Sequence, residues 1–197
     1  MLWIRKDIEA EQVLIQSSDL IAAILRLPDR SMLVVSVYVE GENTAALQDT
    51  TEKLYQLIQE TRIRIGTRLD VVLAGDFNQH DQLWGGDEVL QERQGKADPI
   101  IDLMSEHALR SLLLRGMKTW QKGNQESTIN LVLASVELAT SLVKCTVYTT
   151  EHGSDHRAIK TTFNTVTPEQ VVETRLLFKN APWNDIRTRI ANILRMA

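Results

Sequence analysis

The sequence predicts a mixed α/β domain, and three observations support that fold class. Residues 71–74 form a branched apolar run of the kind found in short buried strands, and the run stops at Gly75. Residues 45–67 repeat apolar side chains at helical spacing. Residues 32–40 alternate like a half-buried strand. With 197 residues, 43% of them hydrophobic, the chain can bury one core of its own.

The N-terminal part of the chain predicts a meander of antiparallel strands followed by a long helix. The expected strands are residues 2–5, 12–15, 20–27 and 32–40. Asn43 or Thr44 is a suitable N-cap for the helix, which we expect at residues 45–67. The opposite face of this helix is charged, which is typical of a solvated surface.

A long segment without periodicity, residues 80–96, follows the buried strand and predicts a functional or mobile loop. Its Trp84 either packs in the core or stacks on a base, and packing is the preferred interpretation. Asp98 and Pro99 predict the start of a short helix. Later strands are expected at residues 111–114, 128–134, 142–149 and 158–163, with a turn at 122–126.

The last part of the chain, residues 166–197, predicts a helical tail that is separate from the domain at residues 1–165. Thr167 and Pro168 have the chemistry of a helix start. Five Lys or Arg side chains against two Asp or Glu after residue 171 make the tail locally basic. Without a core of its own, this segment is expected to dock on the domain or on a partner.

Composition limits the classes of function that the chain can have. No apolar run approaches the roughly 20 residues of a membrane span, and the N-terminus lacks the apolar region of a signal peptide. A lone cysteine, Cys145, excludes an internal disulfide and predicts an intracellular protein, nuclear or cytoplasmic. The net charge of −4 is unusual for a nucleic-acid-binding protein, so such binding would need a local patch or metal ions.

Two polar clusters carry the candidate chemistry. Asp76 and Asn78 follow the buried strand, at the carboxyl end where open sheets place their functional groups. Asp155 and His156 precede the last strand, where a carboxylate beside an imidazole suits acid–base catalysis or metal binding. Taken singly, each cluster also fits an ordinary turn; as an ordered pair they are more specific.

The two clusters resemble the motifs of the endonuclease/exonuclease/phosphatase superfamily, whose signatures are a Gly-Asp-Phe-Asn turn and a C-terminal Ser-Asp-His turn. This chain has them at residues 75–78 and 154–156. Residues 127–135, Ser-Thr-Ile-Asn-Leu-Val-Leu-Ala-Ser, are similar to the strand that the family has between the two turns. Residues 118–120, Lys-Thr-Trp, are similar to the family's Pro-Thr-Trp segment, which precedes that strand. This set of motifs most resembles the endonuclease domain of a non-LTR retrotransposon polyprotein. The resemblance implies a two-sheet sandwich with helices outside, in four α-β-β-α layers.

The resemblance implies Mg²⁺-dependent or Mn²⁺-dependent hydrolysis of a phosphodiester bond in DNA. Asp76 would position or deprotonate the attacking water, and Asn78 would donate to a phosphate oxygen. Tyr38 would lie near the scissile phosphate, although a strand tyrosine is often a core residue. Asp155 would hold the metal, and His156 would contact the phosphate and transfer a proton. An all-oxygen site suits magnesium.

The chain departs from the family pattern in two places. Asn130 stands where the family has an Asp that orients the motif histidine, and an amide lacks the charge and can select the wrong tautomer. The family's first strands, with a metal-binding Glu, have no counterpart here, although Asp81 or Asp87 are candidate replacements. We therefore expect a truncated, impaired nuclease domain, with a sheet edge that could pair two copies. Two alternatives are a non-catalytic binding domain and a phosphatase of small phosphoesters. His80 is a weaker candidate for substrate contact.

Overall fold

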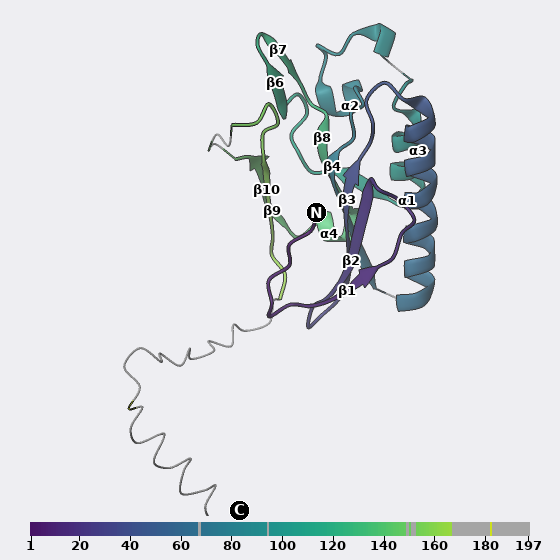
Figure 1. The fold of residues 1–197 in the computed structure, drawn as a ribbon, viewed down its shortest axis with the longest axis vertical. Coiled ribbons are helices and arrows are strands. Elements are labelled where there is room, and N and C mark those ends of the chain that lie inside the picture. The colour runs from purple at the N-terminus through teal and green to yellow at the C-terminus, as the bar shows by residue number, and fades with distance from the viewer. Residues whose placement is uncertain (67, 94, 149, 151–152, 167–181, 183–197) are drawn as a thin grey trace, which may run out of the picture.

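The computed structural model describes residues 1–66, 68–93, 95–148, 150, 153–166 and 182 (Figure 1). The strands and helices in these residues are β1 (Glu9–Val13), β2 (Leu20–Arg26), β3 (Ser31–Tyr38), α1 (Thr44–Ile65), β4 (Leu69–Asp76), α2 (Gln82–Gly85), η1 (Gln91–Arg93), α3 (Asp98–Glu106), β5 (Leu109–Ser111), β6 (Trp120–Lys122), β7 (Gln125–Ser127), β8 (Asn130–Ser135), α4 (Val136–Ala139), β9 (Leu142–Val147) and β10 (Ile159–Phe163).

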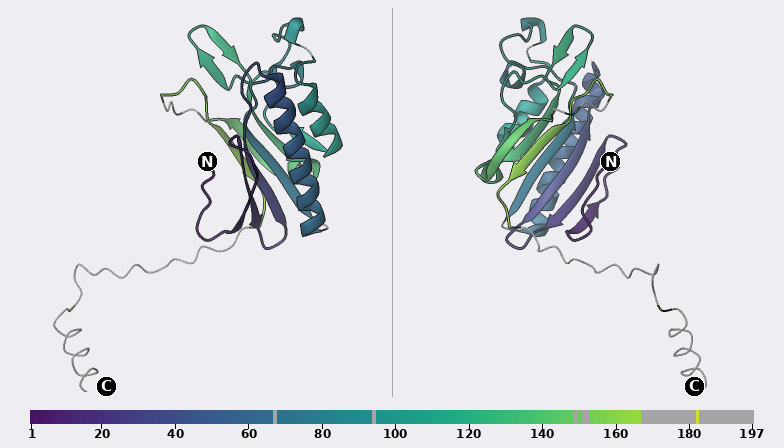
Figure 2. Two further views of the ribbon diagram at one scale, coloured as in Figure 1. Left: turned by 45° about the vertical axis from the view of Figure 1, so that its right-hand side comes forward. Right: turned by 90° about the vertical axis from the view of Figure 1, so that its left-hand side faces the viewer.

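A six-stranded sheet with the order β1-β2-β3-β4-β8-β5 forms the centre of the fold. Helices α1 and α3 cover one face of this sheet, and the two-stranded sheet β10-β9 lies over the other (Figure 2). The main core fills the space under the helices, and a second apolar cluster, which includes Val72 and Val132, packs against Ile159 and Phe163 of β10. The predicted α/β class, with one sheet packed on another, is therefore confirmed, and the described residues contain a third, two-stranded sheet of β6 and β7.

Helix α1 forms for the reasons that the sequence suggests. Asn43 is the N-cap, and its side chain accepts a hydrogen bond of 3.0 Å from the amide of Ala46. Leu47, Leu54 and Ile58 are fully buried along one stripe of the helix, as the periodicity predicts. In the part of the chain that the structure describes, no helix is long and apolar enough to span a membrane.

Several predicted boundaries were wrong. Residues 2–5 are not a strand, and β5 ends where residues 111–114 were expected to begin one. The antiparallel meander ends at β3, as the sequence predicted, because β4 pairs with β3 in parallel. The expected loop at residues 80–96 contains α2 and η1, and the expected turn at 122–126 lies within the β6–β7 hairpin. The tail predicted at residues 166–197 lies outside the described residues, apart from Val166 and Pro182.

The pairing of β3, β4 and β8 positions the candidate site. Tyr38 is paired with Asp76 in the parallel β3–β4 register, and Asp76 is paired with Asn130 in the antiparallel β4–β8 register. Three predicted site residues, far apart in the chain, thus form one row across three neighbouring strands. This row is at the carboxyl end of β3 and β4, where the sequence predicted the chemistry.

Candidate active site

Asp76 ends strand β4, and the turn that follows holds its carboxylate. Asn78 has a positive φ of 49°, which an asparagine tolerates better than most residues. Its backbone amide donates to Asp76 Oδ1 over 3.1 Å, and its Nδ2 donates to Asp76 Oδ2 over 3.0 Å. Nδ2 also donates to the carbonyl of Val39 over 2.9 Å. Both amide hydrogens are therefore used within the protein, and Asn78 fixes the orientation of Asp76.

The half-buried position of Asp76 changes its acidity. Burial raises the pKa of the Asp76 carboxyl above its ordinary value, although the hydrogen bonds from Asn78 and the charge of His156 oppose the rise. Asp155 adds a smaller repulsion in the same direction as burial. A carboxylate that holds its proton more readily is a better general base than an ordinary surface aspartate.

His156 is oriented by Asn130. The distance between His156 Nδ1 and Asn130 Oδ1 is 3.0 Å. The other side of the Asn130 amide, Nδ2, donates to the carbonyl of Thr119 over 3.3 Å. Because a carbonyl can accept but not donate, this bond places Oδ1 toward the histidine and requires a proton on Nδ1. With Oδ1 toward the histidine, the neutral amide suits the tautomer whose Nε2 is free to accept.

His156 Nε2 points toward Asp76. The two atoms that face each other, His156 Nε2 and Asp76 Oδ2, are 3.9 Å apart, which is too long for a direct hydrogen bond. The His156 side chain is 37% exposed and that of Asp76 is 18% exposed, so solvent reaches the space beside them. An imidazole and a carboxylate at this separation can both contact one water or one phosphate oxygen.

Asp155 lies next to this pair but has a different partner. Its side chain is exposed, and its Oδ2 accepts a hydrogen bond of 3.1 Å from the indole Nε1 of Trp120. The backbone of Asp155 is tied to β6, because the amide of Gln121 donates to its carbonyl over 2.8 Å. The structure thus brings Asp155 to the edge of the same site as Asp76 and His156.

Tyr38 completes the row at the β3 side of Asp76. Its side chain is 47% exposed, so the alternative that Tyr38 is a core residue is wrong. The register beside Asp76 leaves the phenol at the surface of the candidate site. A tyrosine hydroxyl in this position can donate to a phosphate oxygen.

Sequence reasoning missed the importance of Thr119, which connects the segments of the site. Its side chain is fully buried, and Oγ1 accepts from the amides of Ile129 and Asn130 over 3.1 and 3.0 Å. Its carbonyl accepts from the Asn130 side chain and from the amide of Arg157. The motif at residues 118–120 includes Thr119, but the sequence alone does not show which groups hydrogen-bond to it.

The donor set of the site is small. Among the described residues, no three or more His, Cys, Asp and Glu side chains are grouped closely enough to hold a metal ion. The proposed replacements for the missing ligand are already engaged, because Asp81 caps α2 and Asp87 pairs with Arg115 at 2.5 Å. Asp76 and Asp155 remain, and one or two carboxylates with waters and a phosphate are a usual environment for Mg²⁺.

The loop after the Asp76 turn is anchored in the core by Trp84. This side chain is 1% exposed, and its indole Nε1 donates to the carbonyl of Gln79 over 3.1 Å. The packing interpretation is therefore confirmed, and Trp84 is not available to stack on a base. His80 lies in the same loop, and burial, reinforced by the charge of Arg93 and opposed by that of Glu42, lowers its pKa from 6.5 to about 4.

We predict that His80 makes the fold sensitive to acid. Its pKa is lower in the folded state, so the neutral form stabilises the fold above pH 6.5, and this stabilisation is lost as the pH falls toward 4. After allowance for solvent screening, the effect should be about 1 to 2 kcal/mol. Urea unfolding at several pH values should show His80→Gln losing less stability than the wild type between neutral pH and about pH 4. An unchanged difference between the two proteins over that range would contradict the prediction.

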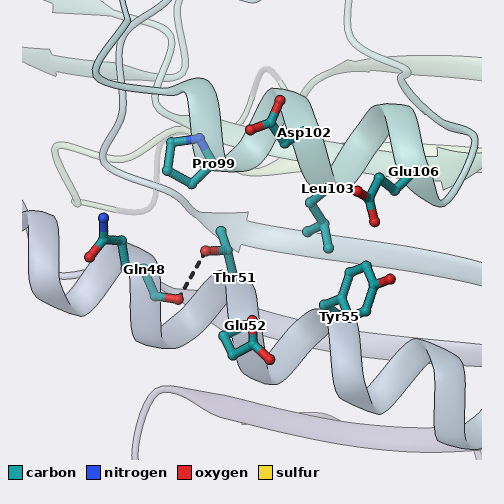
Figure 3. A pocket seen from close by; sticks show the side chains of 8 residues that line it. All are labelled: Gln48, Thr51, Glu52, Tyr55, Pro99, Asp102, Leu103 and Glu106. Carbon is teal, nitrogen blue, oxygen red and sulfur yellow. Dashed lines mark hydrogen bonds between the residues drawn. The ribbon is translucent and has the colours of Figure 1, made fainter.

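A separate pocket of about 430 Å³ lies between α1 and α3 (Figure 3). Tyr55, Glu52 and Glu106 are among its lining residues, and none of the predicted site residues lines it. Figure 3 shows that the side chains that line it come from these two helices. The motif residues therefore define a site at the carboxyl end of β3 and β4 and not in this helical groove.

Comparisons with known proteins agree with the geometry. The model of a family described as Endonuclease-reverse transcriptase matches residues 32–160, which is more than half of the chain. The matched segment contains Tyr38, Asp76, Asn78, Asn130, Asp155 and His156. Among curated proteins, none matches this sequence.

Solved structures share the fold at low sequence identity. One is the endonuclease domain of TRAS1, a telomere-specific non-LTR retrotransposon, with a TM-score of 0.64, 17% identity, and coverage of 82% of this chain and 71% of that one. A second is the 3′ phosphatase NExo from Neisseria bound to a product DNA hairpin, with a TM-score of 0.56, 19% identity and coverage of 82% and 72%. A third is the AP endonuclease LMAP from Leishmania major, with a TM-score of 0.64, 15% identity and coverage of 79% and 61%.

Proposed function

Because the chain belongs to the endonuclease-reverse transcriptase family, we propose that its site hydrolyses phosphodiester bonds in DNA with the help of Mg²⁺. A nuclease or phosphodiesterase type of function follows from the family. The choice of DNA and of magnesium, and the roles of single residues, are our proposal. The retrotransposon endonuclease and the DNA-bound phosphatase among the similar structures support DNA as the substrate.

One observation carries the proposal: in the row of Tyr38, Asp76 and Asn130, a phenol, a carboxylate and a His-orienting amide lie side by side at the carboxyl end of β3 and β4. His156 joins the row through its hydrogen bond to Asn130. These groups are the ones needed to hold a phosphate, to activate a water and to move a proton.

Each residue has a role that its contacts permit. Asp76, held by Asn78 and with a raised pKa, would orient the attacking water and accept its proton. His156, protonated on Nδ1 by the constraint at Asn130, would bind a phosphoryl oxygen when its Nε2 also carries a proton. Tyr38 would donate to another phosphoryl oxygen. Contact between Asn78 and a phosphate would require Asn78 to release one of its present partners.

A divalent cation would be held by Asp155 with Asp76 nearby, together with waters and the substrate phosphate. When bound, it would supply positive charge where negative charge develops on the phosphoryl and leaving oxygens. The all-oxygen donor set favours Mg²⁺ or Mn²⁺ over softer metals. Two carboxylates make a weak site, so we expect binding to be tighter in the presence of substrate.

Asn130 weakens the catalytic group that it orients. An amide positions His156 but adds no negative charge, so it stabilises a protonated imidazole less than a carboxylate would. We therefore propose that this chain is a slow nuclease. The same observation favours the alternative, a binding domain that holds DNA without cutting it.

The deciding experiment is nicking of supercoiled plasmid in Mg²⁺, with EDTA as a control, by the wild type and by Asp76→Asn. We expect slow nicking by the wild type and a loss of at least about 100-fold in the variant, because the amide cannot accept a proton from water. Far-ultraviolet circular dichroism would verify that the variant is folded.

Two results would count against a nuclease. Equal nicking by Asp76→Asn would show that the activity belongs to a contaminant or to other residues. If the wild type is folded and binds the plasmid but does not cut it, the chain is better described as a binding domain.

A further inference from the structure

The indole of Trp120 donates a hydrogen bond to the side chain of Asp155, and the sequence predicted no role for Trp120. We propose that Trp120 is a positioning residue that presents Asp155 to the divalent cation, an inference that rests on the proposed function. The carboxylate of Asp155 is exposed on a turn, where it would otherwise sample several rotamers. The bond of 3.1 Å from the indole Nε1 selects one of them.

The indole bond assigns different tasks to the two carboxylate oxygens. Oδ2 accepts from the indole, and Oδ1 takes no part in this bond and is available to a cation. An indole N–H is a donor without charge and without acceptor capacity. It can therefore orient the carboxylate without competing for the metal or neutralising its charge. Such supporting partners of metal-binding groups commonly affect metal affinity by 10-fold to 100-fold.

The backbone near Trp120 is held independently of its side chain. Trp120 and His156 form an isolated β-bridge. On either side, the amide of Gln121 donates to the Asp155 carbonyl, and the amide of Arg157 donates to the Thr119 carbonyl, each over 2.8 Å. Trp120→Phe keeps these backbone bonds and an aromatic ring but removes the indole donor. The substitution therefore separates the orientation of Asp155 from the position of the turn.

The test is the affinity of the intact chain for Mn²⁺, measured from the electron paramagnetic resonance signal of the free ion. We expect Trp120→Phe to bind Mn²⁺ about 10-fold more weakly than the wild type. Trp3→Phe is the matched control, because Trp3 is 88% exposed and lies outside the site, and it should leave the affinity unchanged. Thermal unfolding should show similar midpoints for all three proteins.

A double-mutant cycle with Asp155→Asn connects the effect to its proposed cause. Trp120→Phe should leave the affinity for Mn²⁺ unchanged when Asp155 is already replaced by Asn. Equal affinity of Trp120→Phe and the wild type, or an equal loss in both backgrounds, would overturn this inference alone. A wild type that binds no Mn²⁺ would overturn the proposed cation site and this inference with it.

Discussion

Asn130→Asp should increase the rate of DNA nicking by about 100-fold or more. The variant places a negative charge next to His156 Nδ1, where the wild type has an amide oxygen at 3.0 Å. The charge would stabilise the protonated imidazole that contacts the phosphate, and the loss of an equivalent charge in serine proteases has an even larger effect. Initial rates of nicking by the two proteins at saturating Mg²⁺ would measure the gain.

The same substitution should cost stability. Asn130 Nδ2 donates to the Thr119 carbonyl, and a carboxylate would place an acceptor against that acceptor. We expect a loss of about 1 to 2 kcal/mol in the free energy of unfolding. Adding Asp76→Asn to Asn130→Asp is the control, because it should abolish the gain in rate. If Asn130→Asp were no faster than the wild type, the absence of charge would not be what limits this site.

Gly75→Ala should destabilise the fold by about 3 to 5 kcal/mol. Gly75 has a φ of +154°, and a Cβ at this position would lie 1.9 Å from the carbonyl oxygen of Val37 on β3. Gly75 and Val37 are paired in the β3–β4 register, so the neighbour that would have to move is backbone. Overpacking and backbone strain each typically cost roughly 1 to 3 kcal/mol, so the expected loss lies in the middle of their combined range of about 2 to 6 kcal/mol.

Gly41→Ala is the matched control for this prediction. A Cβ at Gly41 would meet its nearest atom, Asn78 Cγ, at 3.7 Å, which is an ordinary contact. Urea unfolding of both variants should show a large decrease in midpoint for Gly75→Ala and a small change for Gly41→Ala. A Gly75→Ala protein within 1 kcal/mol of the wild type, roughly, would show that β3 and β4 can separate without cost.

Much of the fold was predictable because its signals are local. The apolar run at residues 71–74 and the helical repeat at 45–67 became β4 and α1 with only small changes in boundaries. The Asn43 cap is also a local feature, because its partner is three residues away. The strand predicted at residues 2–5 failed because a short apolar segment becomes a strand only when a neighbour accepts its backbone hydrogen bonds.

The members of the candidate site could also be predicted, but their connections could not. The ordered motifs named Asp76, Asn78, Asp155 and His156, and they gave Asn130 as a departure from the family pattern. The sequence left open whether the side-chain oxygen or the side-chain nitrogen of Asn130 faces the histidine. That choice depends on the carbonyl of Thr119, which lies in the segment just before β6 and accepts from the Asn130 side chain.

The sequence by itself determined the α/β class, the family and the residue types that can act on a phosphodiester. The tertiary structure decided the parallel pairing of β3 with β4, the row that joins Tyr38 to Asp76, and the bond from Trp120 to Asp155. The physical reason is the range of the forces involved. Propensities and caps act over a few residues, whereas strand register and side-chain hydrogen bonds join positions that are tens of residues apart and exist only after the chain has packed.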